Sequence, residues 1–192
     1  MTESPSQGTR RGTEAIACGL ECSIRAVPDF PRPGISYKDV TPLIEDGTAL
    51  HAAVDALAIA TDGLAYDRIL SAEARGFVFG TALAYRARKG LILARKPNKL
   101  PRETISASYD LEYGTDALEI HADSIPPGTR VLVADDLLAT GGTARAMCQL
   151  VEYAGGTVAG VAFLIELGYL KGRDQLRPYD VISVITYDTP DD

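Results

Sequence analysis

The chain is poor in the residue types that mark several common classes of protein. Its 192 residues include no tryptophan, two histidines and three cysteines. Cys18, Cys22 and Cys148 give no even, regularly spaced set, so a disulfide framework is not predicted. With only His51 and His121 beside them, a zinc site is not expected either. Free thiols in a reducing compartment are the simpler interpretation.

The sequence also lacks long apolar segments. No uninterrupted run of about 18 apolar residues occurs, so no membrane-spanning helix is predicted. Residues 1–12 are polar and lack the apolar core of a signal peptide, and we expect them to form a disordered tail. Residues 13–192 are predicted to form a single domain. A cytoplasmic location is the default expectation for such a chain.

Basic residues are fewer than acidic ones in this chain. Lys and Arg total 19 against 26 Asp and Glu, which gives a net charge of −7, and the isoelectric point is near 4.9. This balance argues against a nucleic-acid-binding surface. Basic residues do cluster in 95–102, so a local site for anions is still possible. The sequence has neither a Walker A motif nor a Rossmann Gly-x-Gly-x-x-Gly, so the familiar nucleotide loops are excluded.

Apolar strand patterns alternate with helical patterns along the chain. Helices are predicted at 13–27, 48–61, 76–89 and 144–153, and extended segments at 35–40, 68–72, 91–94, 131–134, 158–165 and 180–186. A hairpin is predicted from 104–111 and 117–121 around Tyr113–Asp116. This order predicts an α/β fold with a mostly parallel central sheet flanked by helices. Ligands are then expected at the carboxyl ends of the strands.

The most informative segment is 131–143. A buried strand ends in Asp135 and Asp136, and a turn rich in Thr and Gly leads into the helix at 144. Free backbone N–H groups at such a turn, beside a helix N-terminus, can bind a phosphate. The paired carboxylates can accept hydrogen bonds from vicinal hydroxyls, so the segment suits a sugar phosphate. The predicted phosphate-binding residues are Ala139, Thr140, Gly141, Gly142 and Thr143.

Three further segments carry polar groups that fit such a substrate. Arg75 follows a predicted strand and can contact phosphate oxygens in a bidentate manner. Arg95 and Lys99, in a loop with two prolines, could stabilise an anionic leaving group beneath a lid that excludes water. Glu112 could protonate or orient a base. Each has a plainer alternative: a surface ion pair for Arg75, a solvated loop for the basic cluster, and a solvent-facing carboxylate for Glu112.

The 131–143 pattern resembles the phosphoribosyl pyrophosphate (PRPP) motif of type I phosphoribosyltransferases. Nearly the whole chain from Val27 to Tyr187 is similar to the adenine phosphoribosyltransferase family within that group. The resemblance rests on the segments 27–42, 73–77, 95–101, 108–114, 135–143, 166–167 and 170–173. The Phe-Pro-x-Pro-Gly and Leu-Glu-Tyr-Gly stretches narrow the match to the adenine enzymes.

The resemblance implies a purine salvage reaction, in which adenine and PRPP give AMP and pyrophosphate with Mg²⁺. It implies a mobile lid loop or hairpin, a small N-terminal hood over the base, and a homodimer. The metal would be held mainly through PRPP and water, with no dedicated protein ligands. The implied contacts are Asp135 and Asp136 with ribose, Ala139 to Thr143 with the 5′-phosphate, Arg75, Arg95 and Lys99 with pyrophosphate, and Ser36, Tyr37, Lys38 and Leu167 with adenine. Glu112 would be the catalytic residue.

The chain departs from the family pattern at two places. Asn98 stands where many members have Gly, and Glu73–Ala74 replaces an Asp-Ser pair. Two other functions stay open: transfer to another base such as xanthine, hypoxanthine or orotate, and a PRPP-sensing regulator. The regulator would need a DNA-binding module, and only 26 residues precede Val27.

Overall fold

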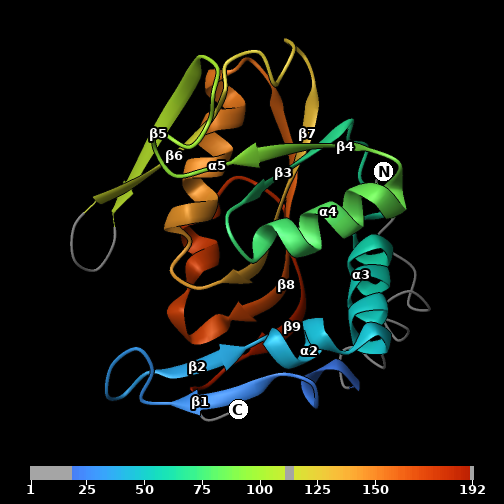
Figure 1. Ribbon diagram of the computed structural model, residues 1–192, viewed down its shortest axis with the longest axis vertical. Coiled ribbons are helices and arrows are strands. Elements are labelled where there is room, and N and C mark those ends of the chain that lie inside the picture. Colours follow the sequence, from blue (N-terminus) through green and yellow to red (C-terminus); the bar gives the residue numbers. More distant parts are fainter. Residues whose placement is uncertain (1–18, 111–114, 191–192) are drawn as a thin grey trace.

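The centre of the molecule is a parallel five-stranded sheet. The computed structural model describes residues 19–110 and 115–190. The strand order is β4-β3-β7-β8-β9, and every neighbouring pair in this sheet is parallel (Figure 1). The strands are β3 (Arg68–Ala72), β4 (Gly90–Ala94), β7 (Arg130–Leu138), β8 (Thr157–Leu167) and β9 (Val181–Tyr187). The predicted α/β fold is therefore confirmed.

Helices cover both faces of this sheet. The helices α3 (Gly47–Thr61) and α4 (Gly76–Ala87) pack on one face, and α5 (Gly142–Tyr153) packs on the other (Figure 1). Successive side chains of a strand point to opposite faces. Accordingly, Ile69 belongs to the core under α3 and α4, while the adjacent Leu70 belongs to the core under α5. No helix in the described part of the chain is long and apolar enough to span a membrane.

An antiparallel ribbon lies outside the main sheet. It consists of β1 (Arg25–Pro28) and β2 (Ser36–Asp39), with Val27 paired to Tyr37. The predicted helix at 13–27 is therefore wrong over residues 22–27, of which the last three lie in β1. The helical spacing of apolar residues ends at Ile24, and backbone pairing with β2 determines the conformation that follows. Within the predicted range 13–27, the structure is helical over 19–21, and residues 13–18 lie outside the described residues.

The predicted hairpin is present as β5 (Thr104–Asp110) and β6 (Thr115–His121). Thr115 and Asp116 belong to β6 and not to the turn, because Asp116 pairs with Tyr109 across the ribbon. The tip at 111–114 lies outside the described residues. Backbone hydrogen bonds in both directions between Arg95 and Glu119 join the hairpin to the chain leaving β4.

Several boundaries differ from the sequence-based prediction. Strand β7 continues to Leu138, so both acids lie within the strand and not after it. The short helix α2 (Thr41–Glu45) and the 3₁₀ helices η1 (Gly168–Leu170) and η2 (Gly172–Leu176) were not predicted. Helices of three to five residues are too short to show a helical period in the sequence.

Asp46 caps the N-terminus of α3 and offers a test of this part of the fold. Its Oδ1 accepts hydrogen bonds from Thr48 N at 2.8 Å and Ala49 N at 2.9 Å. We expect Asp46→Ala to lower the free energy of unfolding by about 1 kcal/mol, or about 2–4 °C in melting temperature. The matched control is Asp62→Ala at the other end of α3, where a carboxylate opposes the helix dipole and its loss should not destabilise. An equal fall in both variants would contradict the capping role.

Candidate active site

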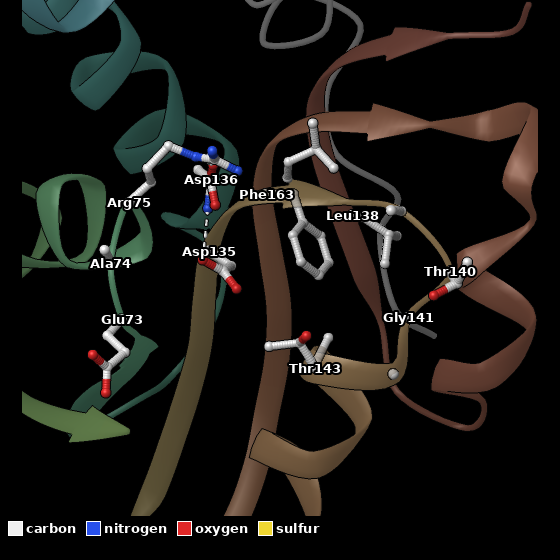
Figure 2. A pocket seen from close by; sticks show the side chains of 14 residues that line it. Glu73, Ala74, Arg75, Asp135, Asp136, Leu138, Thr140, Gly141, Thr143 and Phe163 are labelled. Carbon is white, nitrogen blue, oxygen red and sulfur yellow. Dashed lines mark hydrogen bonds and ion pairs between the residues drawn. The ribbon is translucent and has the colours of Figure 1, made fainter. Parts of the chain in front are cut away.

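A cavity of about 340 Å³ opens at the carboxyl ends of β3 and β7. Its wall is formed by the turn from β3 into α4, the continuous stretch from the end of β7 into α5, and Phe163 on β8 (Figure 2). This is the edge of the sheet at which a parallel α/β fold places its ligands. The lining residues are Glu73, Ala74, Arg75, Phe163 and the continuous stretch 135–144.

The two acids of this cavity have different environments. Asp135 and Asp136 are 8% and 7% exposed. Asp135 Oδ1 accepts a hydrogen bond from Asp136 N at 3.0 Å. Burial, followed by the neighbouring charge of Asp136, raises the pKa of Asp135 well above its ordinary value. Asp136 instead has a cationic partner, since its Oδ2 lies 2.5 Å from Arg75 Nε.

Arg75 connects three parts of the chain. Besides its ion pair with Asp136, it donates a hydrogen bond from Nη1 to the hydroxyl of Tyr37. Its guanidinium carbon is 5.4 Å from the centre of the Tyr37 ring, within cation–π range. Burial tends to lower the pKa of Arg75, but the charge and hydrogen bond of Asp136, together with the charges of Tyr37 and Asp135, outweigh burial and raise the pKa. A permanent positive charge therefore lies at the rim of the cavity.

The loop from Ala139 to Thr143 has the backbone conformation of an anion site. Gly141 has φ of +93° and precedes α5, whose first turn has no side-chain cap. The first amide groups of a helix have no partner within the helix, so here they are available to a ligand. All five predicted phosphate-binding residues line the cavity, together with both acids and Arg75.

Arg95 and Lys99 lie beside the cavity and not in its wall. Arg95 Nε is 3.4 Å from Glu73 Oε1, and Lys96 N donates to the same oxygen at 2.6 Å. Burial tends to raise the pKa of Glu73, but these donors outweigh it and lower the pKa. Glu73 thus tethers the basic loop to the rim of the cavity, while the Lys99 side chain is exposed.

The backbone conformation explains why Asn stands at position 98, where many family members have Gly. The φ of Asn98 is +64°, in the left-handed region that Gly adopts freely and that Asn tolerates better than most other residues. Its N–H donates to Glu119 Oε2 at 3.2 Å. The backbone conformation at position 98 is therefore one that both Gly and Asn can adopt.

The four predicted base-binding residues lie outside the wall of the cavity. Tyr37 reaches its rim through Arg75, and the Phe30 ring packs edge-on against Tyr37 with centres 5.1 Å apart. Lys38 is 3% exposed and its Nζ lies 4.4 Å from the centre of the Tyr187 ring. Tyr187 pairs with Leu167 between β9 and β8. Ser36 is half-buried on β2.

Some lining residues were not predicted from the sequence. Glu73 and Ala74 stand directly before Arg75, so their position in the motif was a usable signal. Phe163 is brought to the site by the register of β7 and β8, which pairs it with Asp135, and it lies between the acids and the loop (Figure 2). Nothing in the local sequence around Phe163 indicates this. The predicted catalytic residue Glu112 lies outside the described residues.

A parallel sheet with buried paired acids, a glycine-containing anion loop and a cationic rim is the arrangement of a phosphoribosyl-transferring domain. In agreement, residues 44–191 match the family model of the phosphoribosyl transferase domain.

More specific similarities come from individual relatives. The chain is 75% identical over 179 residues to an adenine phosphoribosyltransferase from Rubrobacter xylanophilus, covering 93% of this chain and 97% of that protein. The crystal structure of adenine phosphoribosyltransferase from Thermoanaerobacter pseudethanolicus superposes with a TM-score of 0.87 at 50% identity, covering 89% and 99% of the two chains. The Saccharomyces cerevisiae enzyme, crystallised with an imino-altritol bisphosphate and adenine, gives 0.83 at 35% identity, covering 88% and 98%. The chain belongs to the adenine phosphoribosyltransferase family.

Proposed function

We propose that this enzyme transfers the 5-phosphoribosyl group of PRPP to adenine, forming AMP and releasing pyrophosphate in purine salvage. The observation that carries the proposal is the shared cavity, in which the acid pair, Arg75 and the 139–143 loop face one space. The S. cerevisiae relative, whose structure contains adenine, supports the choice of base.

The order of the subsites follows from the chemistry of the wall. The amides of 139–143 would bind the 5′-phosphate, and the carboxylates of Asp135 and Asp136 would accept hydrogen bonds from the ribose hydroxyls. Arg75 would bind the pyrophosphate, where negative charge develops as the bond to ribose C1 breaks. Preorganised cations at that point stabilise the transition state more than the ground state. Arg95 and Lys99 would add to this charge from the adjoining loop.

Mg²⁺ is the proposed cofactor. In the described part of the chain no group of three or more His, Cys, Asp and Glu residues could hold a metal ion alone. We propose that the ion is bound mainly by substrate oxygens and water, as Mg²⁺ commonly is. Asp135 and Asp136 are the carboxylates placed to meet it, directly or through water. When bound, the ion would neutralise the charge of the pyrophosphate.

The base is proposed to bind between the β1–β2 ribbon and the end of β8. Tyr37 would stack on adenine, Leu167 would contact its other face, and backbone groups of Ser36 and Lys38 would bond its edge. A backbone carbonyl can accept from the exocyclic amine of adenine but not from the oxo group of hypoxanthine. A mismatched base would leave polar groups unpaired, which costs more than a lost apolar contact.

The first test is a pyrophosphate-release assay with PRPP, Mg²⁺ and one base at a time. We expect release and AMP formation with adenine, and little with hypoxanthine, guanine or xanthine. Release with a different base would leave the phosphate and ribose subsites in place and overturn the adenine subsite. If PRPP bound but no base supported release, the transferase proposal itself would fail.

Glu112 is proposed to handle the ring proton of adenine. Gln retains a neutral hydrogen bond but cannot exchange a proton, so we expect Glu112→Gln to lower kcat by about tenfold, the value of one charge-assisted bond. The dissociation constant for PRPP should not change. Glu103→Gln, an exposed acid before β5, is the control and should behave as wild type. A near-normal kcat for Glu112→Gln would remove this role.

We also propose a homodimer in the cytoplasm, as the family resemblance implies. Sedimentation equilibrium of the purified protein tests the first point, since a dimer has twice the 20.4 kDa mass of the chain. Cell fractionation tests the second. A monomer with full activity would show that the site is complete within one chain.

A further inference from the structure

The anion loop rests on a segment that the proposed chemistry does not use. This supporting segment, residues 168–176, contains η1 and η2. Gly172 packs against Ala139 O so closely that a Cβ at position 172 would overlap it, and a Cβ at Gly141 would lie 2.6 Å from Gly172 O. Arg145, in the first turn of α5, donates from Nη1 to Gln175 O at 3.0 Å. The loop and the supporting segment therefore fit each other backbone to backbone.

The supporting segment has little regular structure to hold it in place. Its turns are 3₁₀, with hydrogen bonds from Lys171 N to Gly168 O and from Asp174 N to Lys171 O, each 3.0 Å long. Short 3₁₀ turns have poorer hydrogen-bond geometry than an α-helix. Lys171 between them is in the left-handed region, with φ of +55°. The position of the supporting segment therefore depends on contacts outside its own turns: the backbone fit to the 139–143 loop, the buried side chain of Leu176 and the side-chain contacts of Arg173.

Arg173 anchors the supporting segment through its side chain. Its Nε and Nη2 each lie 2.6 Å from one oxygen of Glu166, forming a bidentate pair with a carboxylate on β8 that is 4% exposed. Arg173 Nη1 also donates to Val181 O at 2.7 Å, and Ser183 Oγ donates to Glu166 Oε2 at 2.6 Å. A planar guanidinium bound at both oxygens is fixed in direction as well as in place. The segment is thus anchored to β8 and β9.

We propose that Arg173 is a positioning residue for the 5′-phosphate subsite. Anchored by Glu166, it fixes the backbone of Gly172, which in turn fixes the shape of the 139–143 loop. The proposal rests on the proposed function, because it takes that loop as the binding site of the 5′-phosphate. It places no part of Arg173 on the substrate.

Arg173→Lys is the test, because Lys keeps the charge but cannot form the bidentate pair. We expect the dissociation constant for ribose 5-phosphate, measured by calorimetry, to rise about tenfold, as loss of alignment in a site commonly produces. The constant for pyrophosphate, which would bind at Arg75, should change less than twofold. The control is Arg177→Lys in the same region, whose ion pair with Asp174 at 3.1 Å is exposed; both constants should stay at wild-type values.

A purely structural role for Arg173 predicts a different result. The melting temperature would fall and both ligands would weaken together, which would overturn the proposal, as would an unchanged constant for ribose 5-phosphate. If Arg173→Lys did not fold, Ser183→Ala, which removes one hydrogen bond to Glu166, would replace it. The dissociation constant for ribose 5-phosphate alone should then rise about threefold, the scale of one lost hydrogen bond; no rise would also overturn the proposal.

Hydrogen exchange separates this proposal from the proposed function. In the ligand-free protein, Arg173→Lys should speed exchange of the amides of Arg145, Lys171 and Asp174, which donate to Gly141 O, Gly168 O and Lys171 O, relative to wild type and Arg177→Lys. That readout needs no substrate. If wild type failed to bind ribose 5-phosphate while exchange rose as expected, the phosphate assignment would be wrong and the anchoring role would stand. Unchanged exchange would overturn the anchoring role.

Discussion

Replacing Arg75 with alanine is expected to lower kcat/KM for PRPP by about 10²–10³, the loss typical of removing one group that stabilises transition-state charge. Arg75 is positioned for this role by Asp136 at 2.5 Å and by the hydroxyl of Tyr37. The substitution also leaves the buried carboxylate of Asp136 without its cation beside Asp135. Both effects weaken the pyrophosphate end of the cavity, so inhibition by pyrophosphate should weaken in parallel.

Arg86→Ala is the matched control for Arg75→Ala. Arg86 lies on α4, the helix that Arg75 directly precedes, and its ion pair with Asp55 at 3.0 Å is exposed. Exposed pairs of this kind contribute about 0–1 kcal/mol to stability, so activity should be unchanged. Arg75→Lys should recover only part of the lost activity, because an ammonium group cannot reproduce the fork of the guanidinium. Full activity in Arg75→Ala would remove Arg75 from the pyrophosphate subsite.

Gly141→Ala is expected to lower kcat/KM for PRPP by about 10²-fold, the scale of loss for a displaced binding group. Two penalties coincide at this position. The φ of +93° is unfavourable for any residue with a Cβ, and that Cβ would lie 2.6 Å from Gly172 O. The 139–143 loop must shift to relieve the contact, which moves its amides away from the phosphate. The fall in kcat/KM should come mainly from a higher dissociation constant for PRPP.

Gly128→Ala separates these two penalties. Gly128 has φ of +80°, but nothing lies within 4 Å of a Cβ added there. Both variants should lose stability by about 1 kcal/mol from backbone strain, measured by urea unfolding. Only Gly141→Ala should lose affinity for PRPP. An equal loss of affinity in both variants would show that strain elsewhere in the fold, and not the contact with Gly172, controls the loop.

The sequence predicted those parts of the site that are local in the chain. The strand predicted at 131–134, the two acids and the following turn are contiguous, so one short pattern specified most of the cavity wall. Arg75 could be predicted for the same reason, since it lies in the short turn that follows β3. Parts that depend on pairing between distant segments were missed. Phe163 reaches the cavity by strand register, and Arg25–Pro28 is extended because β2 lies beside it.

The same distinction explains the supporting segment. The Leu-Lys-Gly-Arg stretch at 170–173 was recognised as part of the family pattern, but its mechanical role depends on Glu166 and Ser183, which lie on two different strands. No periodicity in the sequence could show that their side chains converge. Asn98 was recognised as a departure, and its φ of +64° supplied the explanation that the residue type alone could not.

The close approach of α4 to the sheet has a consequence for how this chain can evolve. A Cβ at Gly76 would overlap Asp135 Oδ1, and one at Gly80 would overlap Ser71 Oγ. A larger residue at 80 can be accommodated only by Gly at 71, because Ser71 Cβ itself would lie 2.6 Å from the added Cβ, and Ser71 is not part of the cavity wall. At 76 no such compensation is open, because it would remove Asp135, the carboxylate that the proposed function assigns to the ribose hydroxyls. Among enzymes that keep the acid pair, position 80 should therefore drift together with position 71, while position 76 should not drift at all.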